Sequence, residues 1–309
     1  GETIDEHRDR VSKLWETFNR VACENPYSWV QNPMTAEEIR DPGTSNRLVG
    51  FPYTKAMNSN WDLDQAAALI VCSAEAAEAA GVPRDRWLFP HSGTDGADTN
   101  FVSNRADLHS SPAIRVAGRK AMALAGVTPD DIDHIDLYSC FPSAVQIAAT
   151  EMELGLDRQL TQTGGLTFAG GPLNNYVTHS IATMANVLRE DAGTTGLCSA
   201  NGGYITKHAF GLYSTNPPSQ GFQHEDCQVE IDAFPSVDLD AEHVGSGTIE
   251  AYTVMHGADG PERGLASVRT PNGRQWAGTS DLPLMESMMT EEHVGRSVEV
   301  LPDFSFELV

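Results

Sequence analysis

Two long stretches of this chain contain no formally charged residue. Residues 159–188 include no Asp, Glu, Lys or Arg, and residues 192–206 include none either. A helix predicted over residues 173–188 would therefore have no charged face, which is not typical of a surface helix. Such a helix must be covered on nearly all of its sides. The chain is therefore predicted to fold in several layers around this helix.

Helix and strand patterns alternate in the rest of the first two thirds. The clearest helix is expected over residues 112–125, with Ser111 at the N-cap, Pro112 at the first helical position and Gly126 after its end. Further helices are predicted over residues 6–23, 74–80 and 141–153, and strands over residues 66–72, 87–90 and 134–138. This succession indicates an α/β layered fold.

The composition changes after residue 217. Residues 217–245 are acidic and irregular, and most of them are predicted to form a solvated linker. The following residues show short strand patterns around a Pro271-Asn272-Gly273 turn, at 248–255, 265–269, 275–278, 297–301 and 304–308, with a helix at 281–289. This pattern predicts a small OB-like β-barrel domain over residues 246–309.

The charge and the cysteine content exclude several classes of protein. With 43 acidic and 20 basic residues, a net charge of −23 and a pI near 4.6, the chain is not expected to bind nucleic acid or an anionic membrane. Its five cysteines are scattered without a CxxC pair, which is typical of a reducing, cytoplasmic compartment. The histidines are dispersed, so no metal site is predicted.

Four blocks of sequence resemble the C-terminal half of thiolases, in that family's order and with similar spacing over residues 57–216. They are NSNWDLDQAAALIVCSAEAAEAAGVP, SPAIRVAGRKAMALAGVTPDDIDHIDLYSCF, GGLTFAGGPLNNYVTHS and GLCSANGGYITKHAFGLYS. The non-standard loops resemble those of sterol-carrier-protein-type thiolase-like proteins. The resemblance implies a layered αβα fold for residues 57–216, preceded by a loop region at 1–56. It also implies an N-terminal half, on a separate chain or on a preceding part of a longer one.

The matched loops depart from the thiolase pattern where catalysis is concerned. Gly171 stands where the Gly-His-Pro loop has its histidine, and Asn201 stands where the Cys-x-Gly motif has its cysteine. The Asn-Glu-Ala-Phe loop is replaced by residues 138–141, Tyr-Ser-Cys-Phe. The family's nucleophilic cysteine belongs to the N-terminal half, outside this match. Thiolytic chemistry needs a thiolate and a base, and the matched positions offer neither.

Four residues near these loops are candidates for catalysis, each with an alternative structural role. Tyr138 can serve as an acid or base, or pack in the core. Cys140 is a pocket thiol or a filler, and Cys198 is a second thiol or a buried small hydrophobe. Asn201 can donate to a thioester oxygen, or it can satisfy backbone groups at a glycine-rich turn. His208 follows the same turn and has a weaker claim to a pocket role.

The resemblance implies coenzyme A or an acyl-CoA as ligand, with no tightly bound cofactor. Arg10, Arg20 and Arg47 lie in the loop-like region and can meet its phosphates, while Gly170 and Gly171 permit close backbone approach. The first hypothesis is acyl transfer or C–C bond cleavage on a CoA thioester by a non-standard site. The alternative is a non-catalytic acyl-CoA-binding or scaffold subunit that docks a partner enzyme through its C-terminal domain. A homodimer is the common form that the resemblance implies.

Overall fold

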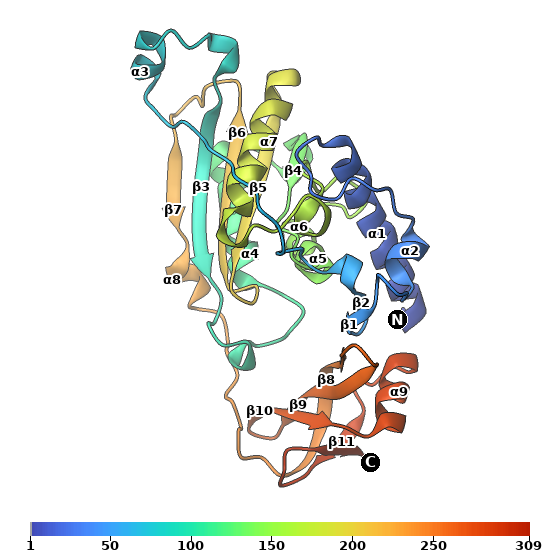
Figure 1. The fold of residues 1–309 in the computed structure, drawn as a ribbon. Coiled ribbons are helices and arrows are strands. Elements are labelled where there is room, and N and C mark those ends of the chain that lie inside the picture. The colour runs from blue at the N-terminus through green and yellow to red at the C-terminus, as the bar shows by residue number, and fades with distance from the viewer. Residues whose placement is uncertain (1) are drawn as a thin grey trace.

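The computed structural model describes residues 2–309 and contains two sheets (Figure 1). The first has the order β4-β5-β6-β3-β7. Its strands are β3 (Phe89–Ala97), β4 (His134–Asp136), β5 (Thr195–Gly202), β6 (Lys207–Ser214) and β7 (Gln223–Asp226). The β4–β5 and β3–β7 pairs are parallel and the other two pairs are antiparallel. This sheet is the middle layer of the larger part of the molecule.

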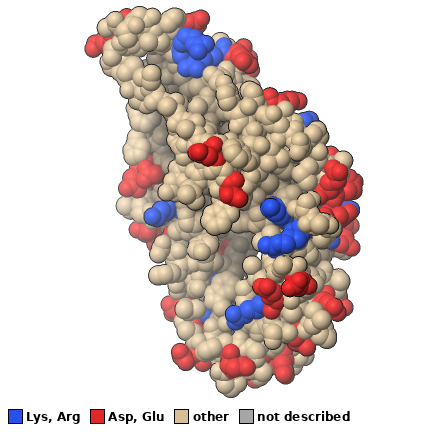
Figure 2. All heavy atoms as spheres, viewed as in Figure 1, with Lys and Arg blue, Asp and Glu red and all other residues tan. Residues whose placement is uncertain are grey.

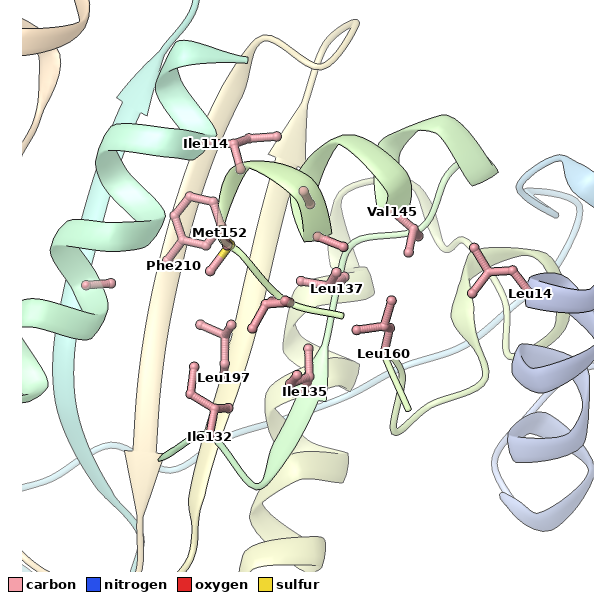
Figure 3. Close-up of a cluster of buried hydrophobic side chains, with 14 of the residues drawn as sticks. Leu14, Ile114, Ile132, Ile135, Leu137, Val145, Met152, Leu160, Leu197 and Phe210 are labelled. Atoms are coloured by element: carbon pink, nitrogen blue, oxygen red, sulfur yellow. The ribbon is translucent and has the colours of Figure 1, made fainter. Parts of the chain in front are cut away.

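Helices cover both faces of this sheet and produce the layered α/β fold that the sequence predicts. Helices α4 (Pro112–Ala125), α5 (Pro142–Glu151) and α8 (Gln228–Ile231) lie on one side, and α7 (Tyr176–Glu190) lies on the other. The hydroxyls of Ser92 and Thr94 on β3 donate to carbonyl oxygens of α4, both at 2.7 Å. Figure 3 shows the apolar cluster between these layers, which includes Ile114, Leu137 and Phe210.

The N-terminal residues form α1 (Ile4–Glu24) and α2 (Ala36–Arg40), which pack at the edge of the larger part. Thr3 and Glu6 form a capping box at the start of α1. The indole of the buried Trp15 donates to the Thr167 hydroxyl at 3.1 Å. Thr167 belongs to the short helix α6 (Gly165–Phe168), so α1 is joined to the segment that precedes α7.

Helix α7 is less covered in this chain than its uncharged sequence predicts. Tyr176, Ser180, Met184 and Leu188 are buried, with Met184 and Leu188 packed against Cys198 of β5. The residues between them on the outer side are only half-buried. Within residues 2–309 no second sheet or helix layer lies over that side. The described chain by itself therefore leaves this side of α7 uncovered, and the N-terminal half that the resemblance implies as its cover stays a prediction.

Residues 66–72 form no strand, which corrects the sequence-based expectation. They are extended but unpaired and lead to α3 (Ala74–Ala79), and Ile70 and Val71 are 95% and 91% exposed. The segment crosses α7 on its way from the region of β2 to α3 (Figure 1). An apolar run of this length is typical of a buried strand, but here it meets no partner strand. We call residues 61–73 the arm.

The strand expected at residues 87–90 is β3, which begins later and extends to Ala97. Sequence reasoning missed most of it because its buried positions are polar. Ser92 and Thr94 are buried, yet their hydroxyls are satisfied by α4 carbonyls. Polar residues at inward positions hide the alternation that normally indicates a strand. The acidic stretch after residue 217 likewise contains β7 and α8, so it is not wholly a solvated linker.

The second sheet belongs mainly to the C-terminal residues. It consists of β8 (Gly245–His256), β9 (Pro261–Thr270), β10 (Gly273–Thr279), β11 (Ser297–Val300) and β12 (Phe306–Leu308), with α9 (Leu282–Thr290). Strands β1 (Leu48–Gly50) and β2 (Tyr53–Thr54) extend the sheet, because Gly50 of β1 pairs with Met255 near the end of β8. The order is β10-β9-β8-β11-β12, and a parallel bridge between Gly278 and Ser305 leads back to β10. The bridge between Gly278 and Ser305 supports a barrel, because it connects the two ends of this strand order. The OB type of the barrel and the domain boundaries at residues 217 and 246 stay predictions.

A buried arginine joins this sheet to the larger part. Arg274 on β10 is fully buried and donates to the carbonyls of Val102, Ser103 and Arg105 at 3.1, 2.9 and 2.8 Å. It also forms an ion pair with Glu250 on β8. Burial alone would raise the pKa of Glu250, but the bonds from Arg274 and Ser267 lower it below its usual value.

No helix among residues 2–309 is long and apolar enough to cross a membrane.

Replacing Arg274 by methionine should strongly destabilise the junction. The change leaves Glu250 without its main cation and three carbonyls without their donor, and breaking a buried pair in this way costs about 3–5 kcal/mol. Urea unfolding followed by tryptophan fluorescence should show a lower midpoint. The matched control is Arg296→Met, which removes an exposed ion pair with Glu291 at 2.8 Å and should leave the midpoint unchanged. Equal midpoints for both variants would contradict the prediction.

Candidate active site

The site is organised by a buried carboxylate at the end of β4. Asp136 is fully buried and accepts hydrogen bonds from the backbone amides of Gln162 and Thr163 at 2.7 and 3.0 Å. Its oxygens also accept from the hydroxyls of Thr161 and Tyr176 at 3.1 and 2.9 Å. One side chain therefore fixes the end of β4, the loop at 161–165 and the first residue of α7.

Glycines allow this loop to pack closely against α1. Gly164 has φ +101°, and a Cβ at this position would lie 2.4 Å from the Cβ of Ala22 and 2.5 Å from its Cα. Because the neighbouring atoms include backbone, no other residue fits without moving the helix. The loop and α1 therefore take one fixed arrangement beside the site.

Gly170 and Gly171 lie against the segment that leads into the arm. The amide of Gly171 donates to the carbonyl of Asn60 at 2.8 Å, and a Cβ on Gly171 would be 2.2 Å from Ser59 Oγ. A Cβ on Gly170 would be 2.5 Å from Gln65 Oε1. Both glycines thus serve close backbone approach within the chain.

A pocket of about 310 Å³ lies between the start of α7 and the β5–β6 hairpin. Its lining includes Tyr138, Tyr176, Asn201, Lys207 and His208, and Lys207 is the charged residue among the lining residues. A smaller cavity of about 10 Å³ shares Tyr138, Asn201 and His208 with it. The structure therefore brings two of the sequence candidates, Tyr138 and Asn201, into one pocket.

Tyr138 is held as a protonated phenol. Its backbone amide donates to the Ser199 hydroxyl at 2.8 Å, and its ring meets the edge of Tyr176 with centroids 5.3 Å apart. Burial, and then the proximity of Cys140, raises the pKa of Tyr138 to about 12. At neutral pH this hydroxyl is a hydrogen-bond donor and not a base.

Cys140 and Asn201 contact each other beside the pocket. Asn201 Nδ2 donates to Cys140 Sγ at 3.7 Å, while Asn201 Oδ1 is buried without a hydrogen-bond partner. Burial raises the pKa of the Cys140 thiol to about 11, although the Asn201 amide opposes the shift. The thiol is thus protonated at neutral pH, which makes it a poor nucleophile.

Cys198 lies on the other face of β5 from Asn201. It is 3% exposed and packs against Met184 and Leu188 of α7, and burial raises its pKa far above the usual value. It is not among the residues that line the pocket. The structure therefore places this candidate in the core and away from the others.

The predicted phosphate-binding arginines also lie outside the pocket lining. Arg10 of α1 forms a bidentate ion pair with Glu2, in which Nε and Nη2 each lie 2.8 Å from a carboxylate oxygen. Arg20 is exposed on the same helix, and Arg47 donates to the carbonyls of Leu48 and His256 at 2.8 and 3.1 Å. Sequence reasoning overlooked Lys207, whose position directly after the glycine-rich turn was the available signal.

His208 lies opposite Asn201 in the β5–β6 register. Its side chain is 2% exposed, and its Nε2 has no hydrogen-bond partner and lies 3.7 Å from Asp98 Oδ2. Burial lowers the pKa of His208 to about 4. Asp98 accepts from the Ala113 amide at 3.0 Å and from the Ser111 hydroxyl, so the start of α4 holds it in place.

Among residues 2–309 no group of three or more His, Cys, Asp or Glu side chains is arranged to bind a metal ion.

Comparisons with known proteins agree with this architecture. The family model described as "Thiolase C-terminal domain-like" matches residues 94–158, and "Thiolase-like protein type 1 additional C-terminal domain" matches residues 226–304. The crystal structure of a monomeric SCP2-thiolase like protein type 1 from Mycobacterium smegmatis superposes with a TM-score of 0.89 and 34% identity, over 100% of this chain and 69% of that one. The chain belongs to the SCP2-thiolase-like proteins of the thiolase superfamily. The resemblance drawn from the four sequence blocks is thus confirmed.

Two curated relatives match shorter parts. An acetyl-CoA acetyltransferase of Methanocaldococcus jannaschii is 36% identical over 129 residues, which are 41% of this chain and 31% of that protein. A 3-ketoacyl-CoA thiolase of Alcanivorax borkumensis is 30% identical over 188 residues, 59% of this chain and 44% of that protein. The matched part of the chain therefore spans less than half the length of each curated relative.

Restoring the histidine of the thiolase loop should not be tolerated. Gly171→His places a large side chain where even a Cβ meets Ser59, and overpacking of this kind costs about 1–3 kcal/mol. Thermal unfolding should show a clear loss. The control is Gly43→His, because a Cβ on Gly43 meets nothing within 4 Å, and this variant should stay within about 0.5 kcal/mol of the parent. A Gly171→His protein as stable as the control would disprove the steric argument.

The Cys140 thiol should alkylate slowly at neutral pH. Its pKa of about 11 leaves little thiolate, and the rate should rise with pH as the thiolate fraction grows. Mass spectrometry of peptides after timed exposure to iodoacetamide measures the rate at each site. Cys72 is exposed and serves as the internal reference. Labelling of Cys140 faster than Cys72 at pH 7 would overturn the assignment of a protonated, buried thiol.

Proposed function

We propose that this protein binds coenzyme A or an acyl-CoA, with the thioester in the pocket between α7 and the β5–β6 hairpin. The observation that carries the proposal is the convergence of Tyr138 and Asn201 on one pocket at the loops that match the thiolase family. The Oδ1 atom of Asn201 is buried there without a partner. A buried polar atom without a partner is costly unless a ligand or water meets it.

The chemistry proposed at this pocket is acyl transfer or C–C bond cleavage on a CoA thioester by a non-standard active site. Tyr138 is a donor suited to a thioester oxygen, and the unpartnered Oδ1 of Asn201 can accept from a water that transfers a proton. Cys140 lies close to both but is protonated. Lys207 supplies positive charge beside the pocket in a chain whose net charge is −23, which favours the phosphates of CoA.

An additional N-terminal half is part of the proposal. The described chain leaves the outer side of α7 and the arm uncovered, with Trp61, Ile70 and Val71 at least 75% exposed. Figure 2 shows that most of this face carries no charged atoms, with two acidic groups near its middle and others at its margins. Exposed large apolar side chains of this kind mark an interface. We place the N-terminal half over α7 and the arm, in the cytoplasm, where the five free cysteines stay reduced.

A non-catalytic role is the second candidate. The resemblance puts Gly171 and Asn201 where the family has its histidine and cysteine, and a Cβ on Gly171 would lie 2.2 Å from Ser59 Oγ. These two facts favour an acyl-CoA-binding or scaffold subunit, which would dock a partner enzyme through the sheet of β8–β12. In this case the pocket binds a thioester but does not transform it.

Calorimetric titration of CoA and acetyl-CoA into the full-length protein tests the binding proposal. We expect saturable binding of both, weakened several-fold in Tyr138→Phe because the hydroxyl that donates to the thioester is lost. Tyr204→Phe is the matched control, since Tyr204 is 82% exposed on the β5–β6 turn and should bind as the parent does. Absence of binding to either ligand would refute the proposed function.

A further inference from the structure

The pocket between α7 and the β5–β6 hairpin has a floor of small side chains. Cys198 on β5 packs against α7, and side chains alternate along a strand, so Ala200 and Gly202 lie on that same face of the sheet. Ala209 and Lys207 are the partners of these two residues on β6 and share their face. All four residues line the pocket. Because three of them have side chains no larger than a methyl group, the sheet leaves room here for a ligand.

The long side chain on this floor is that of Lys207. A Cβ built on Gly202 would lie 3.6 Å from the Lys207 Cβ and 3.9 Å from its Cδ. The aliphatic stem of the lysine therefore lies over Gly202, on the side of the sheet that faces α7. The absence of a side chain at residue 202 gives the lysine this place. Its ammonium group thus belongs to the same pocket as the Tyr138 phenol.

Lys207 has no acidic partner in the part of the chain that the structure describes. Two other lysines, Lys13 and Lys120, form ion pairs with Asp9 and Glu225 at 2.6 and 3.1 Å. No Asp or Glu among residues 2–309 lines the pocket either. In a chain with a net charge of −23, the pocket is therefore opposite in sign to the protein as a whole. The free ammonium favours a ligand that brings negative charge into the pocket itself.

The rest of the lining suits a short carbon chain. Leu173 and Val177, at the start of α7, form an apolar wall, and Tyr138 and Tyr176 contribute aromatic rings. The volume of about 310 Å³ is near the lower end of the ~300–1,000 Å³ that is typical of ligand pockets. An apolar wall with a single cation is suited to a short acyl chain that ends in a carboxylate.

We propose that the protein selects CoA thioesters whose short acyl group ends in a carboxylate, and that this carboxylate pairs with Lys207 in the pocket. The inference rests on the proposed binding of the thioester in the same pocket. The phosphates of CoA are a second source of negative charge, but the pantetheine arm separates them from the thioester. Every CoA thioester carries these phosphates, so attraction to them does not distinguish one acyl group from another. A carboxylate at the end of the acyl group does.

Calorimetric titration of two matched thioesters into the full-length protein tests the selection. Succinyl-CoA carries the terminal carboxylate, and 4-methylpentanoyl-CoA carries an isopropyl group of similar shape in its place. We expect succinyl-CoA to bind about tenfold more tightly, the lower end of what a hydrogen bond between charged groups contributes. Added KCl should reduce this ratio because salt screens the ion pair. The ratio is the readout, since attraction to the phosphates affects both thioesters equally.

Substitutions of the lysine test its part in the selection. Lys207→Met should abolish the ratio, whereas Lys207→Arg keeps the charge and should retain a preference for succinyl-CoA. The matched control is Lys13→Met, which removes one positive charge from a side chain that is 63% exposed and lies outside the pocket lining. This control should keep the tenfold ratio. Because Lys207 is exposed, the thermal unfolding of Lys207→Met should match that of the control.

The outcomes separate this inference from the function on which it rests. Binding of CoA and acetyl-CoA, with equal affinity for the two test thioesters, overturns the selection and leaves the binding proposal intact. Absence of binding to any CoA compound overturns both. A tenfold ratio that persists in Lys207→Met overturns the role of the lysine, and an equal weakening of both thioesters then assigns it to the phosphates. Loss of the ratio in Lys207→Met, with Lys13→Met unaffected, establishes the inference.

Discussion

The carboxylate of Asp136 connects the parts of the molecule on which the site depends. It is buried at the end of β4, and its charge is met by hydrogen bonds from two backbone amides of the loop at 161–165 and from the Tyr176 hydroxyl. That loop in turn packs against α1 through Gly164, and Tyr176 begins α7. Tyr138, which lines the pocket, lies only two residues after Asp136. The hydrogen bonds to Asp136 therefore fix both the core and the edge of the pocket. A buried charge that is satisfied only in one arrangement specifies that arrangement strongly.

The C-terminal sheet reaches the pocket through a single loop. Arg274 donates hydrogen bonds to the carbonyls of Val102, Ser103 and Arg105 in the loop at residues 98–105. Both ends of this loop contact the β5–β6 hairpin. At one end the Asp98 amide donates to the Thr206 carbonyl at 2.8 Å, and at the other the Arg105 side chain donates to the Thr206 hydroxyl at 2.8 Å. The extra domain thereby supports the loop that carries Asp98. Its contribution to the site is mechanical, since no residue of β8–β12 lines the pocket.

The sequence predicted those elements whose local signals agree with their tertiary setting. Helix α4 has its N-cap serine, its first-turn proline and its terminal glycine, and it forms where expected. The arm carries a strand pattern without a partner strand, and β3 hides two buried polar positions, so both were misjudged. Tyr138 follows the end of β4 and Asn201 lies near the end of β5, and both line the pocket, while Cys140 contacts Asn201. Cys198 takes the structural role of a buried small hydrophobe, since residues three apart on a strand point to opposite faces and it faces α7.

The amino-acid sequence by itself determined the family and the layered α/β fold, because these follow from residue types at matched positions. The tertiary structure alone decided which residues line one pocket and which buried polar groups meet. Asp98 and His208 are far apart in sequence and meet only because β3 and β6 are neighbours in the sheet. The burial that shifts the pKa values of Tyr138 and His208 in opposite directions likewise comes from packing between layers. Desolvation depends on every atom around a group, and no local pattern in the chain encodes it.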